Sequence, residues 1–401
     1  MNLGLSIILT LMILISAPFT ASFYKEPSLT SLIAIMALSF FLKNISAIHE
    51  CYIRKEMRFK QLQIIRFFSV LIYGVISISL ALNGKGVWSI VIGFLAMNTF
   101  VLFSNLIIAK MPLHNKLYLN QWRRLFDFSK FVIISVILWH LLNNLDQFIV
   151  GKAFGTEAIG EYALAINYSL IVPVVIGMPF YEVLLSDFSK NQKDLNLIKE
   201  KFLSTMQLLF TLLMPGALLA FFIGDDIFLL ILGTKWQAGA KIFSIYAGCT
   251  ILTTCLIGAN ASYEALGKPQ YNLFVGLYFA PILFILVFFG SKLDIVFMGG
   301  LMALSKICHA TCHYFVINKC FEVNIKNFFT SLKTGLINGF ITALIGFILL
   351  FTLKDYSQLI RIPIFLIAIP SVYCLSVFTL SKNDFEYLKE NLISMIKRKA
   401  S

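Results

Sequence analysis

Charged side chains are scarce in this sequence. Asp, Glu, Lys and Arg together make up 13% of the 401 residues, whereas 59% are hydrophobic. A soluble domain carries about 25% charged residues, so a chain of this composition cannot cover its apolar surface with polar groups. This scarcity excludes an ordinary soluble fold. Repeated apolar runs of about 20 residues can each cross a hydrocarbon core of ~30 Å, and they predict an all-α membrane protein that crosses the bilayer many times.

Catalytic and nucleotide-binding motifs are also missing. The sequence contains no P-loop, no G-x-S-x-G and no H-E-x-x-H, which excludes the enzyme and ATP-driven transporter classes that depend on these motifs. A disulfide framework is not expected either. The seven cysteines lie within apolar runs or on the side assigned below to the cytoplasm. We therefore expect a protein that is not an enzyme and that holds no cofactor.

Twelve apolar spans are predicted, and basic residues fix their orientation. The spans cover residues 3–23, 31–49, 64–82, 87–109, 131–152, 159–180, 203–223, 241–264, 271–290, 294–317, 333–353 and 361–381. With the N-terminus inside, about 23 Lys and Arg residues fall in cytoplasmic segments and about 8 in outer segments. This bias places both termini in the cytoplasm. It also explains the net charge of +13 without a nucleic-acid partner.

A weak internal repeat relates two parts of the chain. Residues 23–59 parallel residues 232–271, because each has an outer motif with Lys and Pro or Trp, a span with scattered polar residues, and a basic inner turn. Repeats of this size are common in transporters, in which the substrate site lies between the halves. The repeat pairs the first span with the seventh. We therefore expect the first half to lack two helices that precede the seventh span in the second half.

The stretch from Asn143 to Ser169 places polar residues where lipid-facing residues would be expected. Asn143, Asn144 and Asp146 lie in an otherwise apolar run, and Tyr162 stands near the start of the next run. A carboxylate inside a membrane helix costs roughly 2.5–3.5 kcal/mol on insertion scales, so it normally faces a protein interior or a wet cavity. Asp146 is expected to face such a cavity; the alternative is a helix-end charge in contact with water.

The tenth span is the most polar and carries a lysine near its midpoint. His309 and His313 follow Lys306 at i+3 and i+7, on one helical face. A lysine at this depth either belongs to a hydrogen-bonding or ion-pair network across the bundle or offers a cation to an anionic ligand in a cavity. A metal site is disfavoured, because two Cys and two His on one helix, within residues 308–313, cannot all converge on one tetrahedral ion.

Other charged residues have two interpretations each. Lys43 lies just inside the middle of the second span, where it either lines the cavity or extends to the inner headgroups. Arg54, Arg58 and Arg66 line an inner mouth, where binding the substrate and anchoring to anionic lipid both fit their charge. Glu264, near the inner end of the eighth span, is expected to contact water or a nearby lysine.

Four stretches carry a resemblance to a known family. They are FYKEPSLTSLIAIMALSF (23–40), IRKEMRFKQL (53–62), NGKGVWSIVIG (83–93) and LDQFIVGKAFGTEAIGEYALAINY (145–168). The last is the most specific, since the Asp, the glycine-containing turn and the following G-x-Y recur together in that family. The whole chain resembles bacterial polysaccharide-export flippases of the Wzx type, in particular the colanic-acid and teichuronic-acid exporter branch of the MATE-like superfamily.

The resemblance implies a bundle of two six-helix lobes with a terminal helix pair, in which this chain begins at the third helix. The expected parts are an incomplete N-lobe, a cytoplasmic amphipathic linker, a C-lobe, and a terminal helix pair with a basic tail, over residues 1–110, 111–130, 131–320 and 321–401. The implied function is transfer of undecaprenyl-diphosphate-linked sugar repeats across the bacterial cytoplasmic membrane by alternating access. The implied partners are the bilayer, this lipid-linked substrate, and polysaccharide polymerase and chain-length machinery.

The implied substrate gives the candidate residues separate roles. Candidates for binding the diphosphate are Lys306, Lys43, His309 and His313. Candidates for hydrogen bonds to sugar hydroxyls are Asn143, Asn144 and Tyr162. Asp146 is the candidate for coupling to a proton or sodium gradient, since a carboxylate in a cavity can alternate between charged and neutral forms.

Three other functions stay open. A cation-coupled multidrug exporter of the same fold would favour acidic over basic residues at mid-depth. A membrane glycan polymerase or ligase would need catalytic groups clustered at the outer face, where the segments are short. A flippase remnant without activity would show the same spans, and only a transport assay would separate it from an active protein.

Overall fold

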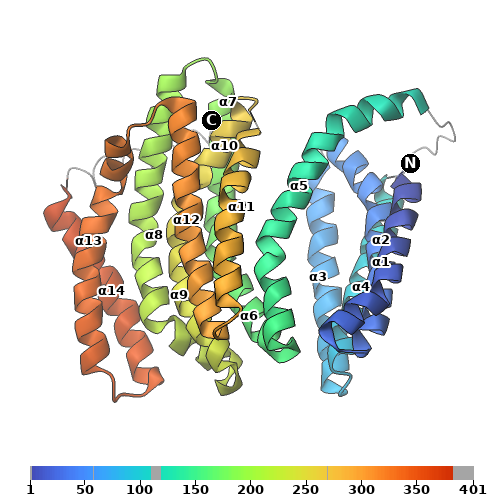
Figure 1. Ribbon diagram of the computed structural model, residues 1–401, viewed down its shortest axis with the longest axis horizontal. Coiled ribbons are helices and arrows are strands. Elements are labelled where there is room, and N and C mark those ends of the chain that lie inside the picture. The colour runs from blue at the N-terminus through green and yellow to red at the C-terminus, as the bar shows by residue number, and fades with distance from the viewer. Residues whose placement is uncertain (1, 57, 110–118, 269, 383–401) are drawn as a thin grey trace. The chain divides into compact units, whose positions relative to one another are not determined.

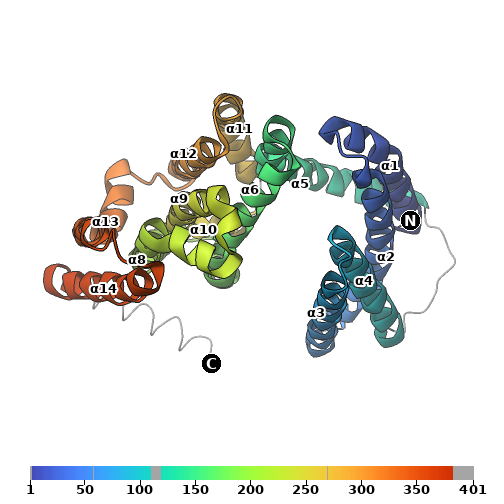
Figure 2. The same cartoon turned by 90° about the horizontal axis from the view of Figure 1, so that it is seen from below.

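The described part of the chain is helical. The computed structural model describes residues 2–56, 58–109, 119–268 and 270–382; the side chains of residues 2, 3, 5, 54, 55, 59 and 119–135 lie outside this description. Figures 1 and 2 show the helices from two directions. No β-strand occurs among the described residues, and the predicted all-α class is confirmed.

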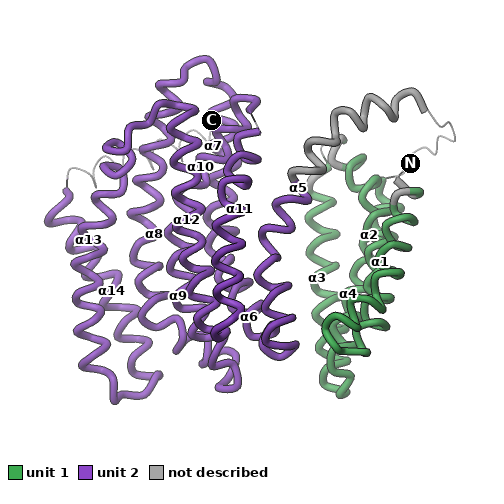
Figure 3. Tube along the Cα trace, in the orientation of Figure 1, with its two compact units in different colours: residues 1–130 green, residues 131–401 purple. Residues whose placement is uncertain are grey.

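Two compact units divide the chain after residue 130 (Figure 3). Unit 1 contains α1 (Asn2–Tyr24), α2 (Ser28–Lys55), α3 (Phe59–Leu82) and α4 (Val87–Ala109). Helix α5 (Leu119–Phe154) starts before the division, and its residues from 131 onward belong to unit 2. The other helices of unit 2 are α6 (Thr156–Ser169), α7 (Met178–Lys190), α8 (Leu195–Leu232), α9 (Gln237–Thr253), α10 (Ile257–Ala265), α11 (Gln270–Gly290), α12 (Ile295–Phe321), α13 (Ile325–Thr352) and α14 (Gln358–Leu380). The finer division into four parts stays a prediction.

The described residues include 11 helical stretches that are long and apolar enough to cross a membrane. They correspond to all the predicted spans except the fifth, residues 131–152, which lies within α5. The chain is therefore a multi-pass membrane protein. Several spans are longer than predicted. The seventh, expected over 203–223, extends over the whole of α8. Asp194 Oδ1 caps the start of this helix by accepting a hydrogen bond from the Leu197 amide over 3.0 Å.

Two of the spans contain breaks in their helical hydrogen bonding. The sixth continues to Lys190, and a π-helical segment, Pro173–Gly177, interrupts it between α6 and α7. Proline has no amide hydrogen to donate to the preceding turn, so the regular helical hydrogen bonding is interrupted where this segment begins, at Pro173. The eighth span, expected as one helix over 241–264, instead consists of α9, a 3₁₀ turn (Thr254–Leu256) and α10.

In unit 1, α2 packs against α1 and α4, and α3 packs against α4. Polar side chains connect the buried faces of α2 and α4, where Asn105 Nδ2 donates to Ser46 Oγ over 2.8 Å. A small residue lets α3 and α4 approach each other, since a Cβ at Gly93 would lie 3.3 Å from the Tyr73 ring. Unit 1 is thus a four-helix layer held by small and polar contacts.

In unit 2, α8 contacts α9, α13 and α14. Figure 2 shows α13 and α14 beside α8 at one edge of the unit and α11 beside α12 at another. Glycines of α13 allow the close approach to α8, since a Cβ at Gly335 would lie 2.6 Å from the Phe210 ring and one at Gly339 would lie 2.8 Å from Met214 Sδ. Arg361 of α14 pairs with Asp226 of α8, which is 4% exposed. The terminal helix pair, α13 and α14, thus packs against α8, and an ion pair connects α14 to α8.

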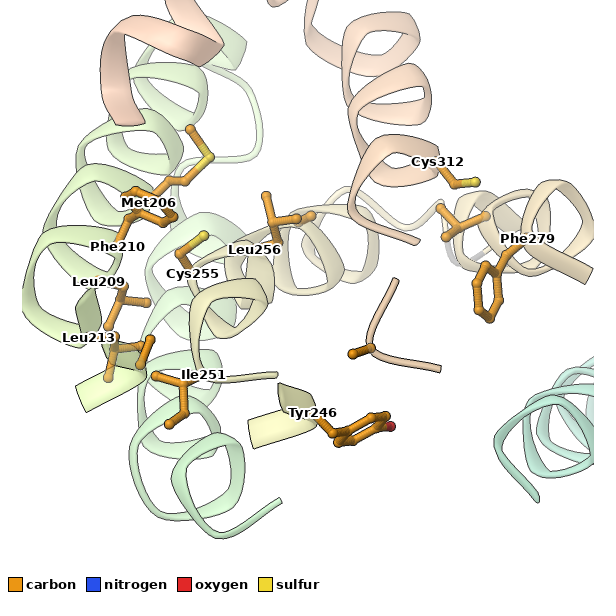
Figure 4. Packing of buried hydrophobic residues seen from close by; sticks show 14 of the residues in the cluster. Met206, Leu209, Phe210, Leu213, Tyr246, Ile251, Cys255, Leu256, Phe279 and Cys312 are labelled. Atoms are coloured by element: carbon orange, nitrogen blue, oxygen red, sulfur yellow. The ribbon is translucent and has the colours of Figure 1, made fainter. Parts of the chain in front are cut away.

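The apolar core of unit 2 contains buried residues from each of its helices, α5 to α14. Figure 4 shows part of it, with Leu209 and Leu213 of α8 beside Ile251 of α9. Tyr246 belongs to the same buried cluster but points away from the α8 leucines in this view. A tyrosine hydroxyl usually finds a polar partner when it is buried, so its direction leads to the polar part of the unit.

Candidate functional site in unit 2

The helices of unit 2 turn at two ends. Helices α5 and α6 meet at Gly155, toward the bottom of Figure 1, and α10 and α11 meet after Ala265, toward the top. These are named here the α5–α6 end and the α10–α11 end. Helix α12 runs from the first end to the second, so a position along α12 gives the depth of a residue within the unit.

Asp146 on α5 and Tyr162 on α6 form a buried hydrogen bond. The Tyr162 hydroxyl donates to Asp146 Oδ2 over 2.6 Å, and the two side chains are 0% and 7% exposed respectively. Gly155 joins the two helices with a φ of 91°, a left-handed conformation that glycine adopts without steric cost. The tight turn brings both residues to the same depth. Asp146 is therefore an interior carboxylate, and the alternative of a helix-end charge in water is wrong.

Lys306 of α12 interacts with the same carboxylate. Its Nζ lies 5.3 Å from the centroid of the Tyr246 ring, and its positive charge attracts Asp146 at longer range than a direct ion pair. Tyr246 belongs to α9, and Gly299 of α12 lets these helices approach, since a Cβ there would lie 2.7 Å from Ile242 Cγ1. An ammonium over an aromatic ring gains about 0.5–2 kcal/mol. Four helices thus contribute to one group of residues.

We call this group the charged cluster; it consists of Asp146, Tyr162, Tyr246 and Lys306. It places an anion and a cation inside a bundle that crosses the membrane, although moving an ion out of water costs several kcal/mol even after relaxation. Oδ1 of Asp146 is buried and accepts no hydrogen bond from the described residues, while the Lys306 side chain is only half-buried. The Lys306 ammonium group, which makes no direct ion pair with Asp146, can therefore bind another anion.

The sequence analysis identified three of these four residues but did not bring them together. Lys306 was expected either in a network across the bundle or in contact with a ligand, and the structure places it in such a network while leaving part of its side chain accessible. Tyr246 was missed. It stands in the apolar run IFSIYAG, where an aromatic residue is expected to belong to the hydrophobic core. Only the packing of α9 on α12 shows that Tyr246 lies next to Lys306.

His309 and His313 share one face of α12 with Lys306, as predicted. The two imidazole centroids are 4.7 Å apart, and Trp139 lies edge-on to His309 at 5.6 Å. His313 is 3% exposed. Nε2 of His309 and Nδ1 of His313 are buried and have no hydrogen-bond partner among the described residues. Both histidines line a polar cavity toward the α10–α11 end, so they connect this cavity with the charged cluster.

The remaining predicted substrate residues lie outside the charged cluster. Asn143 and Asn144 are exposed on α5, and Asn144 Nδ2 donates to the His140 carbonyl oxygen over 2.8 Å. Asn143 thus does not share the buried position of Asp146, although the two are spaced at i, i+3. Lys43 lies in α2 of unit 1 with an exposed side chain.

The predicted inner-mouth arginines belong to unit 1. Arg58 donates to Glu56 over 2.9 Å and to a carbonyl oxygen near the end of α4 over 3.2 Å. Arg66 donates to Glu50 over 2.9 Å. Arg54 lies in α2, and its side chain is outside the described residues. Two of the three arginines therefore already have carboxylate partners, and a role for them in binding headgroups stays a prediction.

Comparisons with known proteins identify a family and a fold. The profile described as "Polysaccharide biosynthesis protein" matches residues 1–241. The teichuronic acid biosynthesis protein TuaB of Bacillus subtilis (strain 168) is 23% identical over 364 residues, 87% of this chain and 72% of that protein. A membrane protein of the cps region of Klebsiella pneumoniae is 23% identical over 399 residues, 94% of this chain and 79% of that protein.

A solved structure extends the comparison to three dimensions. The lipid II flippase MurJ, in an inward closed conformation, matches with a TM-score of 0.69 and 16% identity, over 93% of this chain and 81% of that chain. At this identity the match shows a shared fold. The expected all-α flippase fold is thus confirmed, while the division into lobes stays a prediction.

Proposed function

We propose that this chain, which belongs to the polysaccharide biosynthesis protein family, is a flippase for lipid-linked oligosaccharides. It moves undecaprenyl-diphosphate-linked sugar repeats from the cytoplasmic to the outer leaflet by alternating access, without chemical change to the substrate. The names of two similar proteins support the proposal, since one acts in teichuronic acid biosynthesis and the other flips lipid II. The membrane is the bacterial cytoplasmic membrane.

The charged cluster is the observation that carries this proposal. A diphosphate with its sugars cannot cross ~30 Å of hydrocarbon unaided, because each polar group that loses water without a new partner costs several kcal/mol. The polyprenyl tail has no such need and can stay in lipid. An ammonium group held inside the bundle at Lys306 offers the diphosphate a substitute for water. This cation thus lowers the free-energy barrier that the headgroup meets when it crosses the bilayer.

Binding of a diphosphate at Lys306 gives the cluster a way to couple transport to an ion gradient. When a diphosphate takes the ammonium group, Asp146 retains the hydrogen bond from Tyr162 but loses its positive partner. An unpaired carboxylate in an apolar interior favours its neutral form, so it takes up a proton. Release of the diphosphate on the outer side returns Lys306 to Asp146 and expels the proton. Because Lys306 already supplies a fixed cation, a proton suits this site better than sodium.

The other candidate residues keep the roles that the substrate assigns to them. His309, His313 and Lys43 are proposed to contact the diphosphate, and Asn143 and Asn144 the sugars. The Tyr162 hydroxyl donates to Asp146, so we assign Tyr162 to positioning that carboxylate in addition to its proposed contact with sugar. The cytoplasmic mouth is proposed to be lined by Arg54, Arg58 and Arg66.

Orientation and partners complete the proposal. The excess of basic residues assigns the α10–α11 end and both termini to the cytoplasm. The substrate is then received at the end where the polar cavity lies and released at the α5–α6 end. A polysaccharide polymerase with its chain-length machinery takes over the exported repeat in the outer leaflet.

Genetic complementation tests this function. The chain is expressed in a set of strains that each lack their polysaccharide flippase and that make different repeats, and surface polymer and accumulated lipid-linked repeat are measured. We expect restored polymer and no accumulation in at least one strain. Accumulation in every strain, with the protein present in the membrane, would contradict the function.

The variant Lys306→Met should abolish the rescue, because it removes the cation from the charged cluster. Lys292→Met is the matched control: Lys292 also lies over an aromatic ring, 4.0 Å from the Phe288 centroid, but on the exposed turn after α11. Full export by Lys306→Met would exclude Lys306 from the transport path. Equal loss of export in both variants would indicate a general effect of removing a lysine.

A further inference from the structure

The cavity that His309 and His313 line lies in unit 2, toward the α10–α11 end. It has a volume of about 380 Å³, which is within the range of small-molecule sites. The residues that matter for its chemistry come from five helices and are Trp139, Tyr181, Asn260, Glu264, Asn272 and His313. This cavity is named the α10–α11 chamber. Apart from the histidines, none of its residues was identified as a candidate site residue from the sequence.

Glu264 is the centre of the hydrogen bonding in the chamber. The Tyr181 hydroxyl donates to Glu264 Oε2, and Asn272 Nδ2 approaches Oε1 at 3.5 Å. A tyrosine from α7 and an asparagine from α11 thus hold the carboxylate at the chamber wall, and contact of Glu264 with water stays a prediction. Its side chain is nevertheless exposed, so it can accept further hydrogen bonds from a ligand.

Several buried polar atoms around the chamber have no partner. Oδ1 of Asn272, Nε2 of His309 and Nδ1 of His313 make no hydrogen bond with any described residue. The His313 side chain is only 3% exposed. A buried polar atom left unpaired costs about 1–3 kcal/mol, so a set of three around one cavity indicates a ligand that supplies donors and acceptors.

The composition of the chamber wall selects the class of ligand. A carboxylate at the centre disfavours a diphosphate, which carries the same sign of charge. Donors and acceptors occur together, as a polyhydroxylated ring requires, and the half-buried Trp139 offers an apolar surface for the C–H side of such a ring. The chamber therefore matches a neutral sugar and does not match a second anion.

The position of the chamber relative to the charged cluster fits a substrate that joins a sugar to a diphosphate. His313 follows Lys306 by two turns of α12, about 10 Å along the helix axis, and His309 lies between them on the same face. A headgroup with its diphosphate at Lys306 can thus extend its sugars along this face toward the α10–α11 end.

We propose that the α10–α11 chamber binds a sugar of the lipid-linked repeat and selects which repeat is carried. This inference rests on the proposed flippase function and adds the location and chemistry of sugar recognition. Glu264, Asn260 and Asn272 bind the hydroxyl groups and Trp139 packs against the ring, while His309 and His313 lie between this sugar and the diphosphate at Lys306. Recognition of the sugar is then separate from recognition of the diphosphate.

Equilibrium binding to the purified full chain in lipid nanodiscs tests the inference. Two probes are compared: the lipid-linked repeat extracted from a strain that the chain complements, and undecaprenyl diphosphate without sugar. The variants are Glu264→Gln, which preserves shape, and Asn260→Ala, which provides a second test if the first fails to fold. The control Glu157→Gln makes the same change at an exposed position in the first turn of α6.

Loss of a hydrogen bond to a charged group predicts at least tenfold weaker binding of the lipid-linked repeat by Glu264→Gln, and Asn260→Ala should weaken it several-fold. Binding of undecaprenyl diphosphate should stay within twofold in both variants, whereas Lys306→Met should weaken both probes. Equal weakening of both probes by the chamber variants, or no weakening of either, would overturn the inference. Failure of the unaltered chain to bind either probe would instead overturn the proposed function.

Discussion

The electrostatic attraction between Asp146 and Lys306 makes a specific prediction about stability. Lys306→Met leaves Asp146 inside unit 2 with the Tyr162 hydroxyl as its partner, and Asp146→Asn leaves the ammonium group over the Tyr246 ring without its anion. Either change leaves one of the two charges unpaired inside the bundle, at a buried position for Asp146 and a half-buried one for Lys306. Replacing both residues leaves no charge unpaired. Asparagine can keep the hydrogen bond with Tyr162, and methionine packs well against an aromatic ring.

The expected magnitudes follow from this difference. Removing one partner of a direct buried ion pair costs about 3–5 kcal/mol, and the cost is smaller here because Asp146 and Lys306 attract each other at longer range. Replacing both groups with neutral ones is often close to neutral, so the double variant should cost no more than either single variant. The coupling energy should then be at least about 1 kcal/mol, as for residues of one electrostatic network. By contrast, Lys292→Met and Glu157→Gln change exposed residues and should each stay within about 0.5 kcal/mol and add independently.

Denaturant unfolding in mixed micelles provides the assay. Cys255 and Cys312 are 5% and 4% exposed, so their reaction with a thiol dye reports the opening of unit 2. Cys51, exposed near the end of α2, reacts before unfolding and sets the baseline. A double variant that loses as much stability as both single variants together would refute the attraction. So would single variants that match the parent, since a charge in contact with water costs nothing to leave unpaired.

Two further predictions concern the packing of the terminal helix pair on α8. Gly335→Ala should cost about 1–3 kcal/mol of stability, because the new Cβ would lie 2.6 Å from an α8 aromatic ring. In the control Gly300→Ala the new Cβ meets nothing within 4 Å, so this variant should be neutral or stabilising. A similar loss of stability in both variants would argue against the close α8–α13 contact. Arg361→Met should cost about 3–5 kcal/mol because it leaves Asp226 buried and unpaired. Arg66→Met breaks a more exposed ion pair and should cost under about 1 kcal/mol. Thermal unfolding in detergent compares each pair, and equal effects of the two arginine changes would show that burial at Asp226 is not decisive.

The sequence was informative where a property depends on a single segment. Span length, apolar content and the distribution of Lys and Arg are local quantities, and 11 of the spans they predict correspond to helices in the described residues. The family resemblance likewise rested on contiguous motifs, and it is confirmed by the profile match over residues 1–241. Span edges were less accurate, because a helix such as α8 continues beyond the hydrocarbon core for reasons of capping that hydropathy does not measure.

The sequence was partly informative about the candidate site. Helical periodicity placed Lys306, His309 and His313 on one face, and the cost of a charge in lipid singled out Asp146 as an interior group. These inferences use one helix at a time. They gave Lys306 and Asp146 separate roles, a ligand for diphosphate and a site for ion coupling, without any indication that the two groups interact.

The sequence by itself thus determined that this chain is a multi-pass helical membrane protein of a polysaccharide family, with charges that must be sheltered from lipid. Only the tertiary structure decided which groups shelter them. Tyr246 joined the cluster because α9 packs on α12, and Glu264 joined a chamber because α7 and α11 bring Tyr181 and Asn272 to it. Hydrophobicity is a property of each residue, whereas an ion pair or a binding cavity depends on distances between residues that lie far apart in the chain.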